Sequence, residues 1–336
     1  MTKELSEKIK LISLICTIMV VYRHAHTMEA FFGEYDSTCH IYLFVAHGIT
    51  GMTGIAVPYF FLISGFFFFK QSYYGEGRYV VMLKKKLRTL FVPFCIWNLL
   101  AIYPLWCGGK VTIEDHWYLY VVDFLHSDYN GPLWYVRTLM VFMLLSPLYD
   151  WIFLLDRKIG RKWELTLQLL ILLYVFYIWW PVDSKTLSTE GILFFLLGGI
   201  MRKHESWLNK LLPSKWAYTL FTLWFVSCFL MVLDYWTCKI HLLLGVFLFW
   251  NVIRFGCKGW VASIAGYAFF IYVNHFILLK VIKSLLVPYF HGNEAMALIT
   301  FLLSPWLVVW SMWKVGELWN RISPKSFAWV TGGRAA

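Results

Sequence analysis

The chain has 336 residues, of which 60% are hydrophobic, 20% are aromatic and only 15% are charged. Soluble domains average about 25% charged residues and about 45–50% apolar ones. The composition excludes a disordered chain. It also excludes a water-soluble fold, because too little charge is available to coat so much apolar surface. We therefore expect an all-α polytopic membrane protein, with no nucleic-acid partner despite the formal net charge of +11.

Seven cysteines lie scattered along the chain without any CxxC spacing, which argues against a metal site or a disulfide framework. No bound metal is expected. The first apolar run is long enough to cross a bilayer and lacks a small-residue cleavage site. We therefore predict no cleavable signal peptide.

A transmembrane helix needs about 20 mostly apolar residues, and ten segments of the chain approach that length. The connections between them leave no room for a separate soluble domain, so 1–336 is predicted to form a single transmembrane domain. The sixth and eighth segments are the shortest, and the longest connections lie near 29–49, 70–88 and 109–131. The predicted spans are 9–28, 50–69, 89–108, 133–153, 165–181, 187–201, 216–233, 238–253, 261–282 and 295–313.

The basic residues predict the orientation of these spans. Suppose that the N-terminus is cytoplasmic, that the spans alternate, and that Lys10, Lys239 and Lys280 at span ends are counted with the adjacent segments. The inner side then holds 23 of the 30 Lys and Arg residues and the outer side holds five. This asymmetry follows the positive-inside rule and places both termini in the cytoplasm. The positive charge then belongs to the inner face, where it contacts anionic lipid or holds an anionic cytoplasmic cofactor.

Ionisable groups inside a span are costly and indicate function, and the first such group is Arg23 and His24 with the nearby His26. On a regular helix His24 and His26 lie on nearly opposite faces, so they are not expected to share one site. Histidine can take a proton from a hydroxyl near neutral pH. Catalysis is the favoured role for His24, and a satisfied interfacial position is favoured for His26.

A basic cluster at 84–88 runs directly into the apolar span 89–108. Lys86 and Arg88, with Lys85 beside them, could hold the phosphates of a nucleotide at the inner mouth of the span. The alternative is that these long side chains only snorkel to the interface.

Arg137 lies about one helical turn inside the outer boundary of its span, where it needs a partner or water. It could hold a carboxylate, stabilise an oxyanion or snorkel outward. Trp134, one turn earlier, fits an aromatic belt at the interface.

Three further polar residues fall within predicted spans. Asn274 and His275 lie in mid-span, where either could pair with another helix, and a structural role is favoured for His275. Glu190 is the most span-embedded acid and a candidate partner for His24 or Arg137. The chain contains no Walker loop, GxSxG or HExxH motif, so no soluble catalytic module is predicted.

Four blocks, taken in order, resemble the acyltransferase-3 family of bacterial membrane proteins. The second of them is the most specific match, and FFLLGGIMRK (194–203) and FFIYVNHFILL (269–279) fit more loosely. The chain departs from the family at Ser13, where members often carry arginine, and in its Lys86-Leu87-Arg88 basic pair. The four blocks are VVYRHA (20–25), VPYFFLISGFFFF (57–69), KKKLRTLFVPFCIWN (84–98) and GPLWYVRTLMVFMLLSPL (131–148).

The resemblance implies an O-acyltransferase, most simply an O-acetyltransferase, in the bacterial plasma membrane. It would move an acyl group from acyl-CoA, usually acetyl-CoA, to a hydroxyl of a cell-surface or lipid-linked glycan. Acetyl-CoA is then a donor substrate and no cofactor is permanently bound. The expected partners are acyl-CoA, the glycan acceptor, the lipid bilayer and, as an option, a second copy of the chain.

The resemblance also implies roles for individual residues. His24 would be the general base, and Arg137 or Arg23 would stabilise the oxyanion or the substrate. Glu190 joins them as a catalytic candidate. The donor-binding candidates are Lys85, Lys86, Arg88 and Ser64.

Three alternatives compete with direct transfer. One is a covalent acyl-enzyme on His24 or a serine. Another is a glycan flippase or exporter without transferase chemistry, which would consume no thioester. A sensor or scaffold is disfavoured, because it gains nothing from arginine and histidine in membrane spans.

Overall fold

The computed structural model shows a helical chain with no β-strand among the residues that it describes. This confirms the all-α prediction. The described residues are 2–69, 78–107, 117–149, 152–153, 161–178, 188–231 and 235–334.

The contacts within the chain divide it into two compact units. Unit 1 comprises Met1–Tyr59, Leu211–Ser323 and Arg334–Ala336. Unit 2 comprises Phe60–Lys210 and Pro324–Gly333. Both units are therefore assembled from segments that lie far apart in the sequence.

Four helical segments among the described residues are long and apolar enough to cross a membrane. Every one of the ten predicted spans overlaps a helix, but the count of ten and the orientation of the termini remain predictions. Three shorter apolar helices are Gly131–Leu144, Trp163–Ile178 and Thr237–Val252. The four long segments are His40–Phe68, Tyr79–Tyr103, Ala268–Phe290 and Glu294–Ile322.

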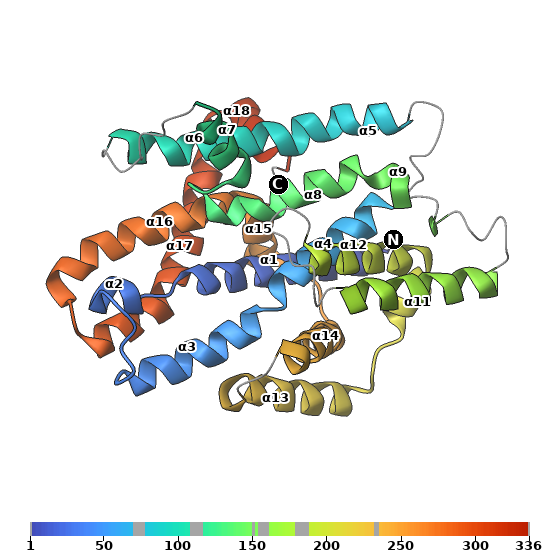
Figure 1. The fold of residues 1–336 in the computed structure, drawn as a ribbon, viewed down its shortest axis with the longest axis horizontal. Coiled ribbons are helices and arrows are strands. Elements are labelled where there is room, and N and C mark those ends of the chain that lie inside the picture. The colour runs from blue at the N-terminus through green and yellow to red at the C-terminus, as the bar shows by residue number, and fades with distance from the viewer. Residues whose placement is uncertain are drawn as a thin grey trace. The chain divides into compact units, whose positions relative to one another are not determined.

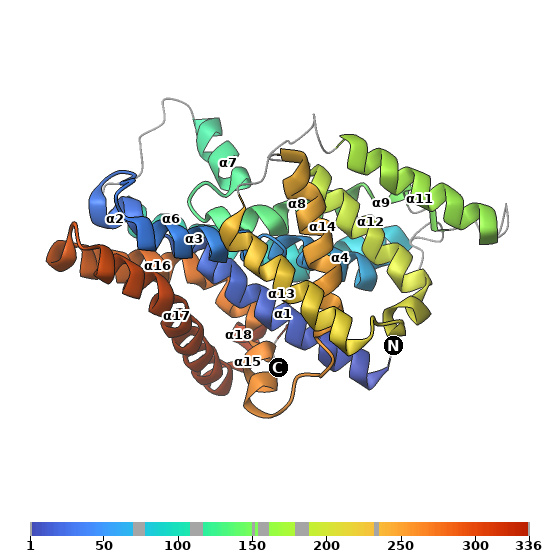
Figure 2. The same cartoon turned by 90° about the horizontal axis from the view of Figure 1, so that it is seen from below.

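Unit 1 is built around its first helix, which packs against α3, α15, α16 and α17. Helices α16 and α17 run side by side as a hairpin, and α13 packs against α3 and α14 (Figures 1 and 2). The helices of unit 1 are α1 (Lys3–His24), α2 (Met28–Phe32), α3 (His40–Thr53), α13 (Ser214–Leu230), α14 (Tyr235–Val252), α15 (Gly259–Gly266), α16 (Ala268–Phe290) and α17 (Glu294–Ile322).

The long connection expected at 29–49 is largely helical, because α2 and the first ten residues of α3 occupy it. The sequence explains α3: Tyr42 and Ala46, one helical turn apart, are both buried. The connections at 70–88 and 109–131 likewise contain helices, α5 (Arg78–Lys86) and α7 (Trp117–His126).

Unit 2 holds the other helices of the described residues. Helix α4 (Ala56–Phe68) crosses the division between the units at Phe60. The others are α5, the π-helical turn η1 (Leu87–Phe91), α6 (Val92–Cys107), α7, the 3₁₀ turn η2 (Gly131–Leu133), α8 (Trp134–Leu144), α9 (Ser146–Tyr149), α11 (Arg161–Ile178), α12 (Thr189–Lys203), the 3₁₀ turn η4 (Glu205–Asn209) and α18 (Pro324–Thr331).

Two glycines allow α4 and α12 to pack backbone against backbone. A methyl group on Gly65 would overlap the carbonyl oxygen of Phe195, and one on Gly198 would overlap that of Leu62. Small residues permit such close approach between helices in membranes. The glycines of the segments SGFFFF and LLGGI therefore have a packing role.

We expect Gly65→Ala and Gly198→Ala each to destabilise the protein, because overpacking typically costs about 1–3 kcal/mol and a backbone cannot rotate aside. Thermal unfolding in detergent measures the effect. Gly131→Ala is the matched control, since a methyl group there would meet nothing within 4 Å. Equal unfolding temperatures for all three variants would contradict the packing role.

Candidate functional site

Helix α1 ends at His24, and the chain leaves the helical path at Ala25 (φ −83°, ψ 0°). The Lys283 ammonium of α16 donates hydrogen bonds to the carbonyl oxygens of His24, at 3.3 Å, and of His26. A cation at the C-terminal end of a helix stabilises the carbonyl groups that have no partner within it. Lys283 therefore holds the backbone on both sides of Ala25.

Thr27 directly follows His26, and hydrogen bonds to two other helices hold it in place. Its amide donates to the Tyr42 hydroxyl of α3 at 2.8 Å, and its hydroxyl donates to the Ala297 carbonyl of α17 at 2.8 Å. Thr27 and Tyr42 are buried. Three helices of unit 1 thus determine how the chain runs past His24.

The His24 ring is half-buried and lies among side chains of α16. Its centroid is 5.3 Å from that of His275, with the planes tilted by 47°, and 5.5 Å from that of Phe276. In the described part of the chain, neither ring nitrogen of His24 has a hydrogen-bond partner. Both nitrogens can therefore serve a substrate.

His275 is fully buried beside His24. Its Nδ1 lies 2.5 Å from the carbonyl oxygen of Tyr272. A carbonyl only accepts, so Nδ1 carries the proton and Nε2 carries the lone pair. Nε2 has no partner among the described residues. Asn274, by contrast, donates to the Phe270 carbonyl of its own helix at 2.8 Å, so this bond links no second helix.

His26 lies beyond the end of α1, so the helical spacing used to separate it from His24 does not apply. The expectation that the two histidines face different sites nevertheless agrees with their neighbours. The Nε2 atom of His26 is 3.1 Å from the Thr50 hydroxyl, and its ring stacks on Phe301 at 5.7 Å. Arg23 is exposed and donates to the Thr50 carbonyl at 3.3 Å.

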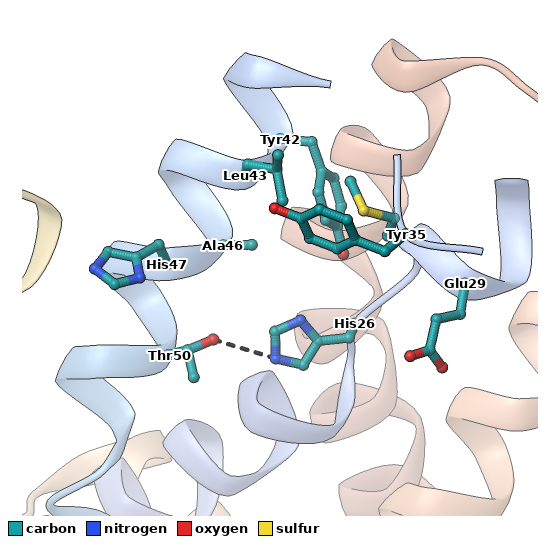
Figure 3. Close-up of a pocket in the computed structure, with 9 residues that line it drawn as sticks. His26, Glu29, Tyr35, Tyr42, Leu43, Ala46, His47 and Thr50 are labelled. Atoms are coloured by element: carbon teal, nitrogen blue, oxygen red, sulfur yellow. Dashed lines mark hydrogen bonds between the residues drawn. The ribbon is translucent and has the colours of Figure 1, made fainter. Parts of the chain in front are cut away.

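His26 and Thr50 line a hollow of about 730 Å³ in unit 1 (Figure 3). Small-molecule pockets span about 300–1,000 Å³, so the hollow is large enough for a ligand. Its walls combine imidazole, carboxylate, hydroxyl and apolar groups. The lining residues are His26, Met28, Glu29, Tyr35, Tyr42, Leu43, Ala46, His47 and Thr50.

Arg137, in unit 2, is buried and caps another helix. Its guanidinium donates to the carbonyl oxygens of Leu125, at 3.4 Å, and His126, at 2.9 Å. These carbonyls end α7, where helix geometry leaves them without intrahelical partners. The observed contacts of Arg137 therefore position α7.

The basic cluster of unit 2 leads into the π-helical turn η1, which contains Arg88. Single π-turns inside helices often mark functional sites. Lys85 and Arg88 are exposed and Lys86 is half-buried. The Arg88 guanidinium lies 5.7 Å from the centroid of the Trp329 ring on α18.

Other candidates in unit 2 take part in its packing. The Ser64 hydroxyl is 2.7 Å from that of Tyr135, which donates to the Phe60 carbonyl at 3.0 Å. Ser64 therefore donates to Tyr135 and links α4 to α8. Trp134 packs against Phe61, and Glu190 lies in the first turn of α12.

A serine and a histidine meet outside these sites, in unit 1. Ser227 Oγ is 2.8 Å from His241 Nε2, but it lies 2.6 Å from the Trp224 carbonyl, which can only accept. The serine proton is thereby directed at Trp224, and His241 donates to the serine oxygen. This polarity is opposite to that of an activated serine nucleophile.

Within the described residues, no group of three His, Cys, Asp or Glu side chains could hold a metal ion. The functional residue that sequence analysis missed is Lys283, which counted only as a cation on the outer face. Its position near the outer end of a span that also carries His275 was the available signal.

Comparisons with known proteins agree with the sequence blocks. A family model described as an acyltransferase domain matches residues 8–315. The chain is also similar to the succinoglycan biosynthesis protein ExoH of Rhizobium meliloti (strain 1021), with 26% identity over 215 residues. That match covers 60% of this chain and 54% of the relative, so the chain spans about half of the relative's length. No solved structure matches.

We expect Lys283→Met to loosen the chain around His24. Hydrogen bonds to charged groups contribute about 1.5–3 kcal/mol each, so amide exchange at Ala25 and Thr27 should accelerate by about tenfold or more. Hydrogen-exchange mass spectrometry measures this. Lys280→Met is the control, because Lys280 instead lies 4.3 Å from the Phe276 ring centroid. Equal amide exchange rates at Ala25 and Thr27 in both variants would contradict the role assigned to Lys283.

Proposed function

The chain belongs to the acyltransferase-3 family, and we propose that it is a multi-pass membrane O-acyltransferase of the bacterial plasma membrane. It would move an acyl group, acetyl in the simplest case, from acyl-CoA to a glycan hydroxyl. The similarity to a succinoglycan biosynthesis protein supports a polysaccharide acceptor. The observation that carries the proposal is His24, whose backbone is held by Lys283 while its ring nitrogens have no partner among the described residues.

His24 acts as the general base in this proposal. It takes the proton of the acceptor hydroxyl while that oxygen attacks the thioester carbonyl. The C–S bond then breaks, and the CoA sulfur leaves with the proton from the imidazolium. We propose direct transfer, and the Ser227–His241 pair is not oriented to activate Ser227 as a nucleophile.

His275 is a positioning residue for His24. Its Nε2 lone pair lies on a ring 5.3 Å from the His24 ring, centroid to centroid. An N–H of His24 donated toward this lone pair would leave the other nitrogen of His24 as the base. The hydrogen bond made by one ring nitrogen of a histidine sets which nitrogen carries the proton.

Arg23 is the favoured oxyanion stabiliser. It neighbours His24 in the last turn of α1, and its guanidinium stays charged at any working pH. One nitrogen contacts the Thr50 carbonyl, which leaves other donors for a substrate. The contacts of Arg137 with the end of α7 favour a positioning role for that residue instead.

The donor phosphates are proposed to bind Lys86 and Arg88, with Lys85 as a further cation. Phosphates form strong charge-assisted hydrogen bonds with Lys and Arg. The exposure of Lys85 and Arg88 around the π-helical turn supports this assignment. Ser64, which is hydrogen-bonded to Tyr135, is better explained by packing.

We expect His24→Ala to lower acyl transfer by about 10²–10⁴-fold, since general-base catalysis contributes that much. The measurement follows acetyl-CoA thioester consumption by the purified protein with a polysaccharide acceptor. Cys16→Ala serves as a control for a substitution in the same helix that should leave the chemistry intact. Undiminished acyl transfer by a folded His24→Ala variant would contradict the proposed mechanism. A folded wild-type protein that consumes no thioester would favour the flippase alternative.

We also expect acetyl-CoA to raise the unfolding temperature of the wild type, and Lys86→Ala/Arg88→Ala to abolish that rise. A ligand at about 100 times its Kd stabilises by about 2.7 kcal/mol. Lys210→Ala/Lys215→Ala removes the same charge from another predicted cytoplasmic segment and should keep the rise. Equal shifts in all three proteins would reject this donor site.

A further inference from the structure

The hollow of unit 1 contains polar groups without protein partners. In the described part of the chain, the Glu29 carboxylate and the Tyr35 hydroxyl form no hydrogen bond. His47 donates from Nε2 to the Met231 carbonyl at 3.1 Å, which leaves Nδ1 as an acceptor. A carboxylate, a phenol and an imidazole nitrogen therefore face a ligand-sized space with free hydrogen-bonding capacity (Figure 3).

The hollow also has an aromatic wall. The Tyr35 side chain is 68% exposed, and Figure 3 shows its ring beside the space that His26 and Glu29 also line. An exposed aromatic ring with a polar tip suits a ligand that has both an apolar face and hydroxyl groups. A pyranose ring has this character, because its C–H bonds form an apolar face and its hydroxyls both donate and accept.

The segment that carries Tyr35 is acidic. Glu29 lines the hollow, and Glu34 and Asp36 flank Tyr35 in the chain. The Thr38 hydroxyl and amide donate to the Asp36 carboxylate at 2.7 and 2.9 Å. These bonds lower the pKa of Asp36 below its usual value, so the carboxyl stays ionised.

Two cations near the hollow, Arg23 and Lys283, contact backbone carbonyls and are not among its lining residues. Arg23 donates to the Thr50 carbonyl, and Lys283 donates to those of His24 and His26. The described residues that line the hollow include the Glu29 carboxylate and no lysine or arginine, so an anionic ligand would meet a like charge at close range.

We propose that this hollow is the acceptor subsite and that it selects an uncharged saccharide. Tyr35 stacks on a sugar ring, and Glu29 and His47 accept hydrogen bonds from its hydroxyls. The hollow begins at His26, two residues beyond the base, and Lys283 holds the carbonyls of both histidines. Identifying the bound saccharide as the acceptor rests on the proposed function, but saccharide binding itself can be tested without acyl transfer.

The test is calorimetric titration of the detergent-purified full chain with cellotetraose, and with cellotetraose whose primary hydroxyls are oxidised to carboxylates. We expect the neutral tetrasaccharide to bind more tightly than the oxidised one. Tyr35→Ala should weaken binding of cellotetraose by about tenfold, the upper range for an aromatic stacking contact. Tyr35→Phe should retain it. Glu29→Gln should narrow the preference for the neutral probe.

Tyr289→Ala is the matched control, because Tyr289 is 81% exposed in the same unit and does not line the hollow. It should bind cellotetraose like the wild type. The proposal is overturned if folded wild type binds neither probe, if it binds both equally, or if Tyr35→Ala and Tyr289→Ala behave alike.

The outcomes separate this inference from the proposed function. Saccharide binding that depends on Tyr35, in a protein that consumes no acetyl-CoA, would support the hollow and reject the transferase. Acyl transfer that is indifferent to Tyr35→Ala would support the transferase and reject the hollow as its acceptor subsite.

Discussion

The contact between the Lys283 ammonium and the carbonyl oxygens of His24 and His26 is the constraint on which the candidate site depends. It fixes the point at which α1 stops being a helix. It therefore fixes which histidine ends the helix and which begins the loop. The hydrogen bonds of Thr27 to Tyr42 and Ala297 continue this constraint by one more residue. His24 is thereby directed at α16 and His26 at the hollow, although only one residue separates them.

The sequence blocks that carry the family resemblance contain residues of two kinds: some contribute to packing, and others are candidates for the chemistry. Gly65, in the most specific block, lets two helix backbones touch, and Ser64 beside it links α4 to α8. Arg137 ends α7. The ring nitrogens of His24 have no hydrogen-bond partner among the described residues, and Lys85 and Arg88 of the 84–88 cluster are exposed instead. A shared motif can therefore preserve packing as readily as chemistry, and burial with satisfied hydrogen bonds distinguishes the two.

Much of the fold could be predicted from composition and apolar run length, because a membrane permits few alternatives to helices. His24 could be singled out because an ionisable group near the end of an apolar span is costly. The end of α1 at His24 could not be predicted, because groups more than 250 residues away along the chain set it, namely the Lys283 ammonium and the Ala297 carbonyl. The contacts of Arg137 could not be predicted either, because their acceptors are backbone carbonyls, which every residue carries. The sequence did not single out Tyr35 as a binding residue, because a single exposed aromatic residue in a polar loop is ordinary.

The C-terminal segment has a consequence for how the protein is made. Helix α18 buries Phe327 completely and packs against α6, where Trp97 donates to the Val330 carbonyl at 2.8 Å. Gly332, with φ +64°, lies so close to the Thr89 carbonyl of the π-helical turn that no side chain would fit. The surroundings of Arg88 are thus completed by residues that the ribosome adds more than 230 positions later. Leu211–Ser323 of unit 1 must therefore be synthesised before α18 can complete unit 2.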